Sequence, residues 1–284
     1  QLRTTWCAPD EAINAWTCEV TVKLHGGANK IRLCAPAPQL EDVPPPPPIR
    51  LPLAALTPLV SLLKSAVQKN VRRCRADEAV ACARALLLLA DHASGARTGE
   101  AELLRRLPIL FIEDALPHPH IMPVVTWLMS AHSKGFPLSV EHHCYLLDAV
   151  RQCAATRWKE ETRANDHLKR ASLMDVADAP PDEAPASALV GALLVRAAFG
   201  GMKGDVRMLE AAADCWWSRL RDVAPSDGDV AVSRASWWLS QLEHAFALGH
   251  YLSEFHNFAH MLLEDTKCTK FAGSAGEPPT TMNE

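Results

Sequence analysis

Features that would single out one class of protein are scarce in this chain. Aromatic residues make up only 6% of its 284 residues, and just two of them are tyrosines. No apolar run approaches the roughly 20 residues that a membrane-spanning helix needs, so we expect no membrane partner. The net charge of −4 gives no general attraction to nucleic acid, and binding of that kind would require a local basic patch.

Cysteine motifs are also missing. The nine cysteines are dispersed, and none forms a Cys-x-x-Cys pair. Most of them fall inside apolar helical patterns, where a free cysteine acts as a small hydrophobic residue. We therefore expect a reduced, intracellular protein with no cofactor and no metal ion. Because the chain begins at Gln1 without a methionine or a charged-then-apolar leader, we also expect it to be a fragment of a longer polypeptide.

The first 40 residues carry the pattern of a β-hairpin. Apolar and polar residues alternate over 16–24 and again over 30–34, and turn-forming residues occupy 25–29. Five consecutive prolines follow at 44–48. Such a run favours extended polyproline II, so we interpret 41–52 as a linker. The alternative is a docking peptide for a proline-recognising domain.

From residue 53 onward the apolar spacing is helical. Apolar residues recur at intervals of three and four, and the chain is rich in alanine and leucine. This predicts a mainly α protein, a multi-helix bundle or array with a small N-terminal β-hairpin at 1–40. The remaining regions are a helical subdomain at 53–174, an acidic, proline-rich loop at 175–185, a second helical subdomain at 186–271 and a disordered tail at 272–284. Individual helices are expected at 140–158, 159–174, 184–199, 205–223, 230–248 and 250–267.

Five cations lie close together near the start of the helical region. They are Lys64, Lys69, Arg72, Arg73 and Arg75, and no acidic residue interrupts this part of the chain from 53 to 76. On a helix they spread over a polar face opposite the leucines, where contact with nucleic-acid phosphates is possible without reading base sequence. The alternative is a solvated face whose charges favour the negative end of the helix dipole.

Two arginines and two adjacent carboxylates interrupt the most apolar stretch of the chain. Isolated acids beside so much apolar surface must reach water, find a cation or shift their pKa values. Arg106 and Glu113 are seven residues apart, which suggests too long a distance for a simple ion pair, and Pro108 is expected to kink or divide the helix. We expect the acids to meet a basic partner from another helix or to cap the N-terminus of a neighbouring helix. The resulting interpretation is a structural polar lock formed by Arg105, Arg106, Glu113 and Asp114.

Histidines recur at helical spacing near the C-terminus. His256, His260, Glu264 and Cys268 follow one another every four residues. Two histidines four residues apart can bind zinc, but the His-Glu-x-x-His arrangement of zinc enzymes is not present. We therefore favour one face of an amphipathic helix. Weaker signals of the same kind come from His118, His120, His142 and His143.

Turn residues predict two helix starts. Ser139 is a candidate N-cap, but His142 stands where a capping box has Glu or Gln, so no capping box is expected. The glycine-rich segment 200–205 lacks the spacing of a phosphate-binding loop. It predicts a turn in which Asp205 caps the next helix.

Residues 63–158 also carry a series of short motifs in a recognisable order. They are Lys64-Ser65, Ala79-Val80-Ala81-Cys82-Ala83-Arg84, Arg105-Arg106-Leu107, Ile112-Glu113-Asp114 and His118-Pro119. In this order they resemble the helical domain that follows the ATPase module in the MgsA and Werner-helicase-interacting family of clamp-loader-like ATPases. That family has a serine where Ile112 stands, and no Walker motif occurs here, so ATP hydrolysis is not implied. The resemblance implies a helical oligomerisation or collar module linked to replication.

The sequence favours a non-catalytic helical interaction or oligomerisation module in a DNA-replication or other nucleic-acid-handling assembly. The expected partners are other protein subunits, or the rest of a longer chain, and a nucleic-acid backbone. The alternative is a helical enzyme that uses the acidic pair or a His-rich metal site.

Overall fold

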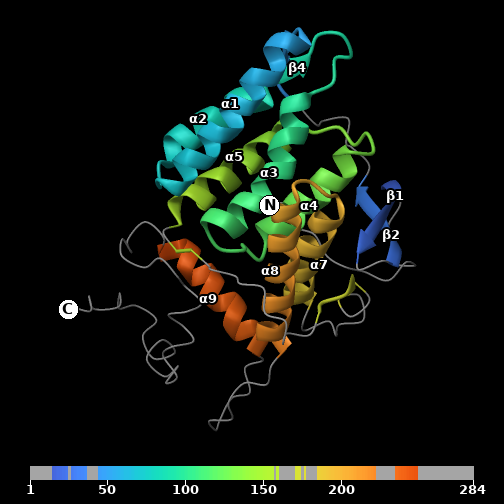
Figure 1. The fold of residues 1–284 in the computed structure, drawn as a ribbon, viewed down its shortest axis with the longest axis vertical. Coiled ribbons are helices and arrows are strands. Elements are labelled where there is room, and N and C mark those ends of the chain that lie inside the picture. The colour runs from blue at the N-terminus through green and yellow to red at the C-terminus, as the bar shows by residue number, and fades with distance from the viewer. Residues whose placement is uncertain are drawn as a thin grey trace, which may run out of the picture.

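The fold is mainly helical, as the apolar spacing predicts (Figure 1). The computed structural model describes residues 15–24, 27–36, 44–156, 158–159, 170–173, 176, 184–221 and 234–248. Its helices are α1 (Leu53–Arg72), α2 (Ala76–Leu87), α3 (Thr98–Asp114), α4 (Ile121–His132), α5 (Val140–Ala155), α7 (Ala184–Ala198), α8 (Lys203–Arg221) and α9 (Arg234–Leu248). None of these described helices combines the length and the apolar character that crossing a membrane requires.

The predicted N-terminal hairpin is confirmed. Its strands, β1 (Ala15–Leu24) and β2 (Gly27–Pro36), pair antiparallel along their whole length. Val20 and Val22 are buried, and the hairpin lies against α7. Trp16 makes edge-to-face contacts with Trp127 of α4 and with Phe136, at ring-centroid distances of 6.1 and 4.9 Å. Helices therefore cover the apolar face that would leave an isolated two-stranded sheet marginally stable.

Part of the predicted linker is a strand. β3 (Ile49–Leu51) pairs in parallel with β4 (Leu89–Asp91), and α1 and α2 connect the two strands. The Ile49 N–H donates to the Leu88 carbonyl at 2.6 Å. The interpretation of 41–52 as a linker is therefore wrong for 49–51, because a distant segment supplies backbone partners that the local pattern does not reveal.

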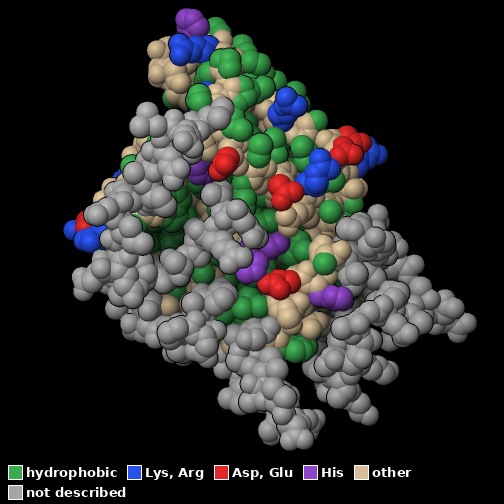
Figure 2. Space-filling model, turned by 180° about the vertical axis from the view of Figure 1, so that it is seen from behind, with side chains coloured by type: hydrophobic (Ala, Val, Ile, Leu, Met, Phe, Trp, Pro, Cys, Tyr) green, Lys and Arg blue, Asp and Glu red, His purple; other side chains and the backbone are tan. Residues whose placement is uncertain are grey.

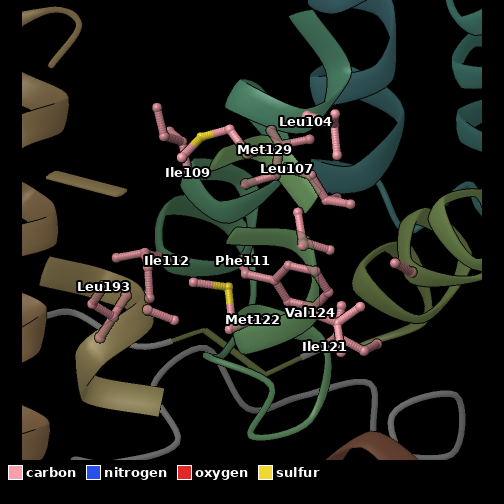
Figure 3. Close-up of a cluster of buried hydrophobic side chains, with 14 of the residues drawn as sticks. Leu104, Leu107, Ile109, Phe111, Ile112, Ile121, Met122, Val124, Met129 and Leu193 are labelled. Carbon is pink, nitrogen blue, oxygen red and sulfur yellow. The ribbon is translucent and has the colours of Figure 1, made fainter. Parts of the chain in front are cut away.

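Helix α3 lies at the centre of the core. Its apolar side chains are buried around several faces, and Figure 3 shows them gathered with Met122 and Met129 of α4 and Leu193 of α7. Pro108 does not divide the helix, which runs unbroken from Thr98 to Asp114. A proline removes one intrahelical hydrogen bond, and here its ring is buried with the rest of the apolar surface.

The N-terminal end of α3 approaches α2 very closely. A Cβ atom added to Gly99 would lie 1.7 Å from the carbonyl oxygen of Leu86. Only a residue without a side chain fits at this position. Gly99 thereby fixes where the following residue, Glu100, enters the core.

Helices α7, α8 and α9 complete the same core. α4 packs against α7, α3 against α8, and α8 against α9 (Figure 1). The buried guanidinium of Arg196 on α7 donates from Nε to the Arg105 carbonyl of α3 at 2.9 Å. Apolar burial is continuous from Val20 in the hairpin to Ala245 in α9. The described parts of the predicted subdomains 53–174 and 186–271 thus share one core.

Several predicted segments lie outside the described residues. They are the helix 250–267, the tail 272–284 and most of the loop 175–185. The expected helix 159–174 is described only in part, and Lys159 and residues 170–172 are not helical. Ala171 instead donates its N–H to Asp214 Oδ1 of α8 at 2.8 Å, so a side chain takes the place of a helical carbonyl.

Candidate functional site

Two of the five cations predicted for phosphate contact form ion pairs with carboxylates of the same chain. Lys64 Nζ lies 2.5 Å from Glu102 Oε2. Arg72 lies beside the acidic pair, with Nε 2.7 Å from Asp114 Oδ1 and Nη2 3.1 Å from Glu113 Oε1. Its hydrogen bond to Asp114 is the main reason that the pKa of Arg72 is raised. Both cations therefore already have carboxylate partners within the chain.

The other three cations form a basic turn between α1 and α2. Lys69, Arg73 and Arg75 are exposed, and no carboxylate in the described part of the chain lies within 4.0 Å of them. Cys74 sits between the two arginines at φ 54°, a left-handed conformation that ends α1 and reverses the chain. On the face shown in Figure 2, side chains of both signs are dispersed among apolar surface.

The acidic pair lies in a polar network between α1 and α3. Only 1% of the Asp114 side chain is exposed, and Arg72 covers it. Gln68 of α1 donates from Nε2 to Glu113 Oε2 at 2.8 Å, and its Oε1 accepts from Arg106 Nη2. The same Arg106 nitrogen lies 3.4 Å from Glu113 Oε2. We call this set the α1–α3 network: Gln68, Arg72, Arg106, Glu113 and Asp114.

The expectation that Arg106 and Glu113 are too far apart is wrong. Positions seven residues apart return to nearly the same face of a helix, and two long side chains close the axial separation of about 10.5 Å. Arg106 also reaches α8, with Nη1 3.7 Å from Asp205 Oδ2. Asp205 is not the predicted N-cap, because α8 begins at Lys203 and Asp205 lies in its first turn.

Arg105 does not join the α1–α3 network. Its side chain is 56% exposed, and its Nη1 lies 3.8 Å from Glu102 of the same helix. The predicted polar lock is therefore wrong in including Arg105, and it lacks two residues of α1, Gln68 and Arg72. Carboxylates whose oxygens already accept bonds from two guanidinium groups and an amide are arranged to hold helices together rather than to transfer protons.

A second acidic site lies at the opposite end of α3. The Glu100 side chain is only 1% exposed, and its Oε1 lies 2.8 Å from His143 Nε2 of α5. The same oxygen lies 3.2 Å from Arg97 Nη1, and Oε2 lies 3.9 Å from His132 Nε2 of α4. We call Arg97, Glu100, His132 and His143 the Glu100 cluster.

The sequence interpretation missed the Glu100 cluster. Glu100 and His143 are 43 residues apart, so no spacing rule joins them. One signal was present, because Glu100 occupies the same helical face as Leu103, Leu104 and Leu107. An acid on a face that is otherwise apolar predicts a buried carboxylate with a polar partner.

A cleft of about 480 Å³ opens beside the Glu100 cluster, and we call it the histidine cleft. Its polar groups include Arg97, Glu100, His132 and His142. Apolar surface comes from the segment between α4 and α5, which includes Phe136. A concave site with a few convergent polar groups is a candidate binding site.

A capping box fixes the wall of the histidine cleft where α5 begins. Ser139 N–H donates to His142 Nδ1 at 3.0 Å, and His142 N–H donates to Ser139 Oγ at 3.4 Å. The expectation that no capping box forms is therefore wrong. An unprotonated imidazole nitrogen accepts the backbone hydrogen bond that a Glu or Gln side chain accepts in the usual box.

His118 and His120 attach the start of α4 to α9. The Nδ1 atom of His118 accepts from the N–H groups of His120 and Ile121 at 3.2 and 3.3 Å. Burial lowers the pKa of His118 from its ordinary value of 6.5 to about 4, which keeps the ring neutral near pH 7. His120 Nε2 lies 2.8 Å from Glu243 of α9, and the His118 ring lies 4.4 Å from the ring of Phe246.

The described ranges contain no group of three or more His, Cys, Asp or Glu side chains arranged to hold a metal ion. The predicted helical face with His256, His260, Glu264 and Cys268 lies outside these ranges. The seven cysteines that the structure describes form no disulfide with one another. Burial raises the pKa of one of them, Cys153, well above its ordinary value.

Comparison with known proteins does not identify a family for this chain. No protein-family model, no curated protein and no solved structure matches the chain.

Proposed function

We propose that this chain is a non-catalytic helical interaction module of a nucleic-acid-handling assembly. The observation that carries the proposal is the basic turn, in which Lys69, Arg73 and Arg75 are exposed without a carboxylate partner among the described residues. Three cations at one turn can neutralise phosphates, and such contacts position a protein on nucleic acid without selecting a sequence.

The other half of α1 supports a role for protein partners. Leu53 and Leu62 of α1 are 67% and 64% exposed, and Ile49 of the adjacent β3 is 52% exposed. Burying exposed leucine and isoleucine side chains against another subunit, or another part of a longer chain, would lower the free energy of the assembly. Helix α1 thus offers exposed leucines in its first half and positive charge at its end.

The resemblance to the helical domain of the MgsA and Werner-helicase-interacting ATPases agrees with this proposal. The motifs that carry the resemblance include Lys64 and the Arg105–Asp114 stretch, which contribute to the packing of α1 against α3. On this proposal the chain supplies the assembly with a structured surface, and another part of the assembly supplies the chemistry.

A binding assay tests the proposal. Fluorescence anisotropy with labelled DNA is measured over a range of salt concentrations for the triple variant Lys69→Gln, Arg73→Gln, Arg75→Gln. We expect weaker binding and a shallower salt dependence, by up to about 0.9 in the log–log slope for each phosphate of duplex DNA that the variant fails to neutralise. Arg72 is left intact because removing it would unpair the buried Asp114.

A second triple variant controls for the change in net charge. Lys134, Lys203 and Arg207 are exposed cations away from the basic turn. Their replacement by glutamine makes the same change in charge and should leave both affinity and slope close to those of the unmodified chain. Equal losses in both triple variants, or an unchanged affinity in the first, would contradict the proposal.

The alternative of a helical metalloenzyme makes a different prediction. Elemental analysis of the purified full chain before and after chelation measures any retained zinc. Zinc in stoichiometric amount would favour the alternative and count against a purely non-catalytic module.

A further inference from the structure

We infer that the histidine cleft is a recognition groove for proline-rich peptides in the polyproline II conformation, and that the chain's own prolines at 44–48 cover one side of it. This inference does not depend on the proposed function. It identifies a ligand class for a site and gives the proline run a role other than spacing.

The burial of the prolines matches the geometry of polyproline II. Pro45 and Pro48 are half-buried, whereas Pro44, Pro46 and Pro47 are exposed. A polyproline II helix has three residues per turn, so residues three apart lie along the same edge. One edge of the proline segment therefore faces the protein, and Pro44 and Pro45 form part of the lining of the histidine cleft.

The chemistry of the cleft complements a proline run. Proline has no backbone N–H, so such a segment offers carbonyl acceptors and apolar rings but no donors. The cleft supplies a donor, because Arg97 Nη2 lies 3.1 Å from the Pro46 carbonyl oxygen. It also supplies an apolar surface, with Phe136 among the residues that line it. Aromatic-lined grooves with well-placed donors are how proteins recognise preformed polyproline II ligands.

Buried groups hold the Arg97 donor in place. Arg97 Nη1 lies 3.2 Å from Glu100 Oε1, and the same oxygen lies 2.8 Å from His143 Nε2. A guanidinium is a rigid planar fork, so fixing one nitrogen on Glu100 aims the other at the Pro46 carbonyl. Glu100 and His143 act as positioning residues for this contact.

The proline segment binds as a tethered ligand. Strand β3 follows it directly and pairs with β4, which keeps the prolines beside the cleft. A ligand on a short tether has an effective concentration on the order of millimolar. A free proline-rich peptide must compete with this segment, so the chain's own prolines restrict access to the groove.

A peptide-binding experiment tests the inference. The probe is a fluorescein-labelled peptide with the sequence of residues 42–48, which leaves out β3. The receptor is the full chain carrying Pro44→Ser, Pro45→Gly, Pro46→Ser, Pro47→Gly and Pro48→Ser, and the reference is the unmodified chain. We expect the substituted chain to bind the probe at least tenfold more tightly, because the Arg97 donor and the side of the groove that the prolines cover are then open to the probe. Equal affinity for the two chains, or no binding to either, would overturn the inference.

Two further variants locate the binding. Adding Arg97→Ala to the substituted chain should weaken probe binding at least tenfold, whereas adding Arg84→Ala, an exposed arginine on α2, should not change it. A control peptide with Gly and Ser in place of the prolines should not bind. Full affinity in the Arg97→Ala variant, or tight binding of the control peptide, would refute the assignment.

A measurement without the Arg97 substitution covers the case in which that variant does not fold. In the chain that lacks the prolines, the probe should shift the imidazole NMR signals of His132 and His142, which line the cleft. The signals of the exposed His92 and His244 should not move. Shifts at the exposed pair alone would place the peptide elsewhere and reject the inference.

Discussion

The two ends of α3 hold buried carboxylates in different ways. At the C-terminal end, Glu113 and Asp114 meet guanidinium groups in a seam between α1 and α3. At the N-terminal end, Glu100 meets two imidazoles as well as Arg97, and the surrounding groups line a cleft. Guanidinium groups keep their charge and bind carboxylates through a rigid fork, whereas imidazoles both donate and accept.

This difference shows how one apolar helix can serve two purposes. The α1–α3 network joins its carboxylates to guanidinium and amide groups of the same two helices, so it stabilises helix packing. In the Glu100 cluster, one nitrogen of Arg97 is held from inside and another is directed to a backbone carbonyl at the surface. At the C-terminal end of α3 the acids therefore attach one helix to another. At the N-terminal end Glu100 holds Arg97, a group that lines the cleft.

The largest effect should come from removing Glu100, whose side chain is 1% exposed, rather than Glu113, whose side chain is 34% exposed. Glu100→Ala leaves the Arg97 guanidinium and His143 without their partner, and we expect a loss of about 3 kcal/mol in the free energy of unfolding. Glu113→Ala should cost about 1 kcal/mol, because solvent screens a pair whose members are partly exposed. Urea unfolding of both variants measures the difference. Equal losses would mean that the two ends of α3 are not distinct.

An intermediate effect should appear on acidification, and His118 should cause it. The pKa of His118 is about 4 in the folded chain against an ordinary value of 6.5, so the unfolded chain binds the extra proton first as the pH falls. The contribution is fully present above pH 6.5 and is lost between pH 6.5 and pH 4. We expect a loss of about 2 kcal/mol between pH 7 and pH 5. Urea unfolding across this range measures it.

The variant His118→Asn provides the control for this pH dependence. Asparagine keeps an acceptor that can cap α4 but does not titrate, so the decline between pH 6.5 and pH 4 should become flatter. An unchanged decline would show that His118 does not cause the acid sensitivity.

The smallest effect should separate the two neighbouring arginines of α3. Arg106→Ala removes contacts with Gln68, Glu113 and Asp205, and we expect it to cost about 1 kcal/mol. Arg105→Ala removes an exposed side chain and should change the free energy of unfolding by less than about 0.5 kcal/mol. The same urea titration distinguishes them. A larger loss of unfolding free energy for Arg105→Ala than for Arg106→Ala would show that Arg105, and not Arg106, belongs to the α1–α3 network.

Much of the fold was predictable from local patterns. The alternation around Val20 predicted the hairpin, and apolar spacing predicted the helices that contain Leu59, Leu86 and Leu146. Helix ends were less accurate, since α8 begins two residues before the predicted 205 and α5 ends at Ala155 rather than at 158. Helix ends depend on capping groups and loop contacts, which are less regular than the apolar period.

The candidate sites were less predictable. The apolar stretch around Glu113 and Asp114 predicts a polar anchor that needs a basic partner, but it does not indicate Gln68 or Arg72. Glu100 shares a face with leucines, yet nothing nearby in the sequence points to His143, and the residue type of His142 does not predict a capping box. In each case the deciding contact depended on the direction of a side chain in space.

The sequence by itself determined that this chain is mainly helical, begins with a β-hairpin and contains a charged interruption in its most apolar helix. These properties follow from periodicity and composition over a few consecutive residues. Only the tertiary structure decided that Arg72 faces Asp114 and Glu113, and that His143 faces Glu100, because these partners are 41 to 43 residues apart. The packing of helices around α3 sets which side chains meet across such distances, and with it which acids join two helices and which lie beside a cleft.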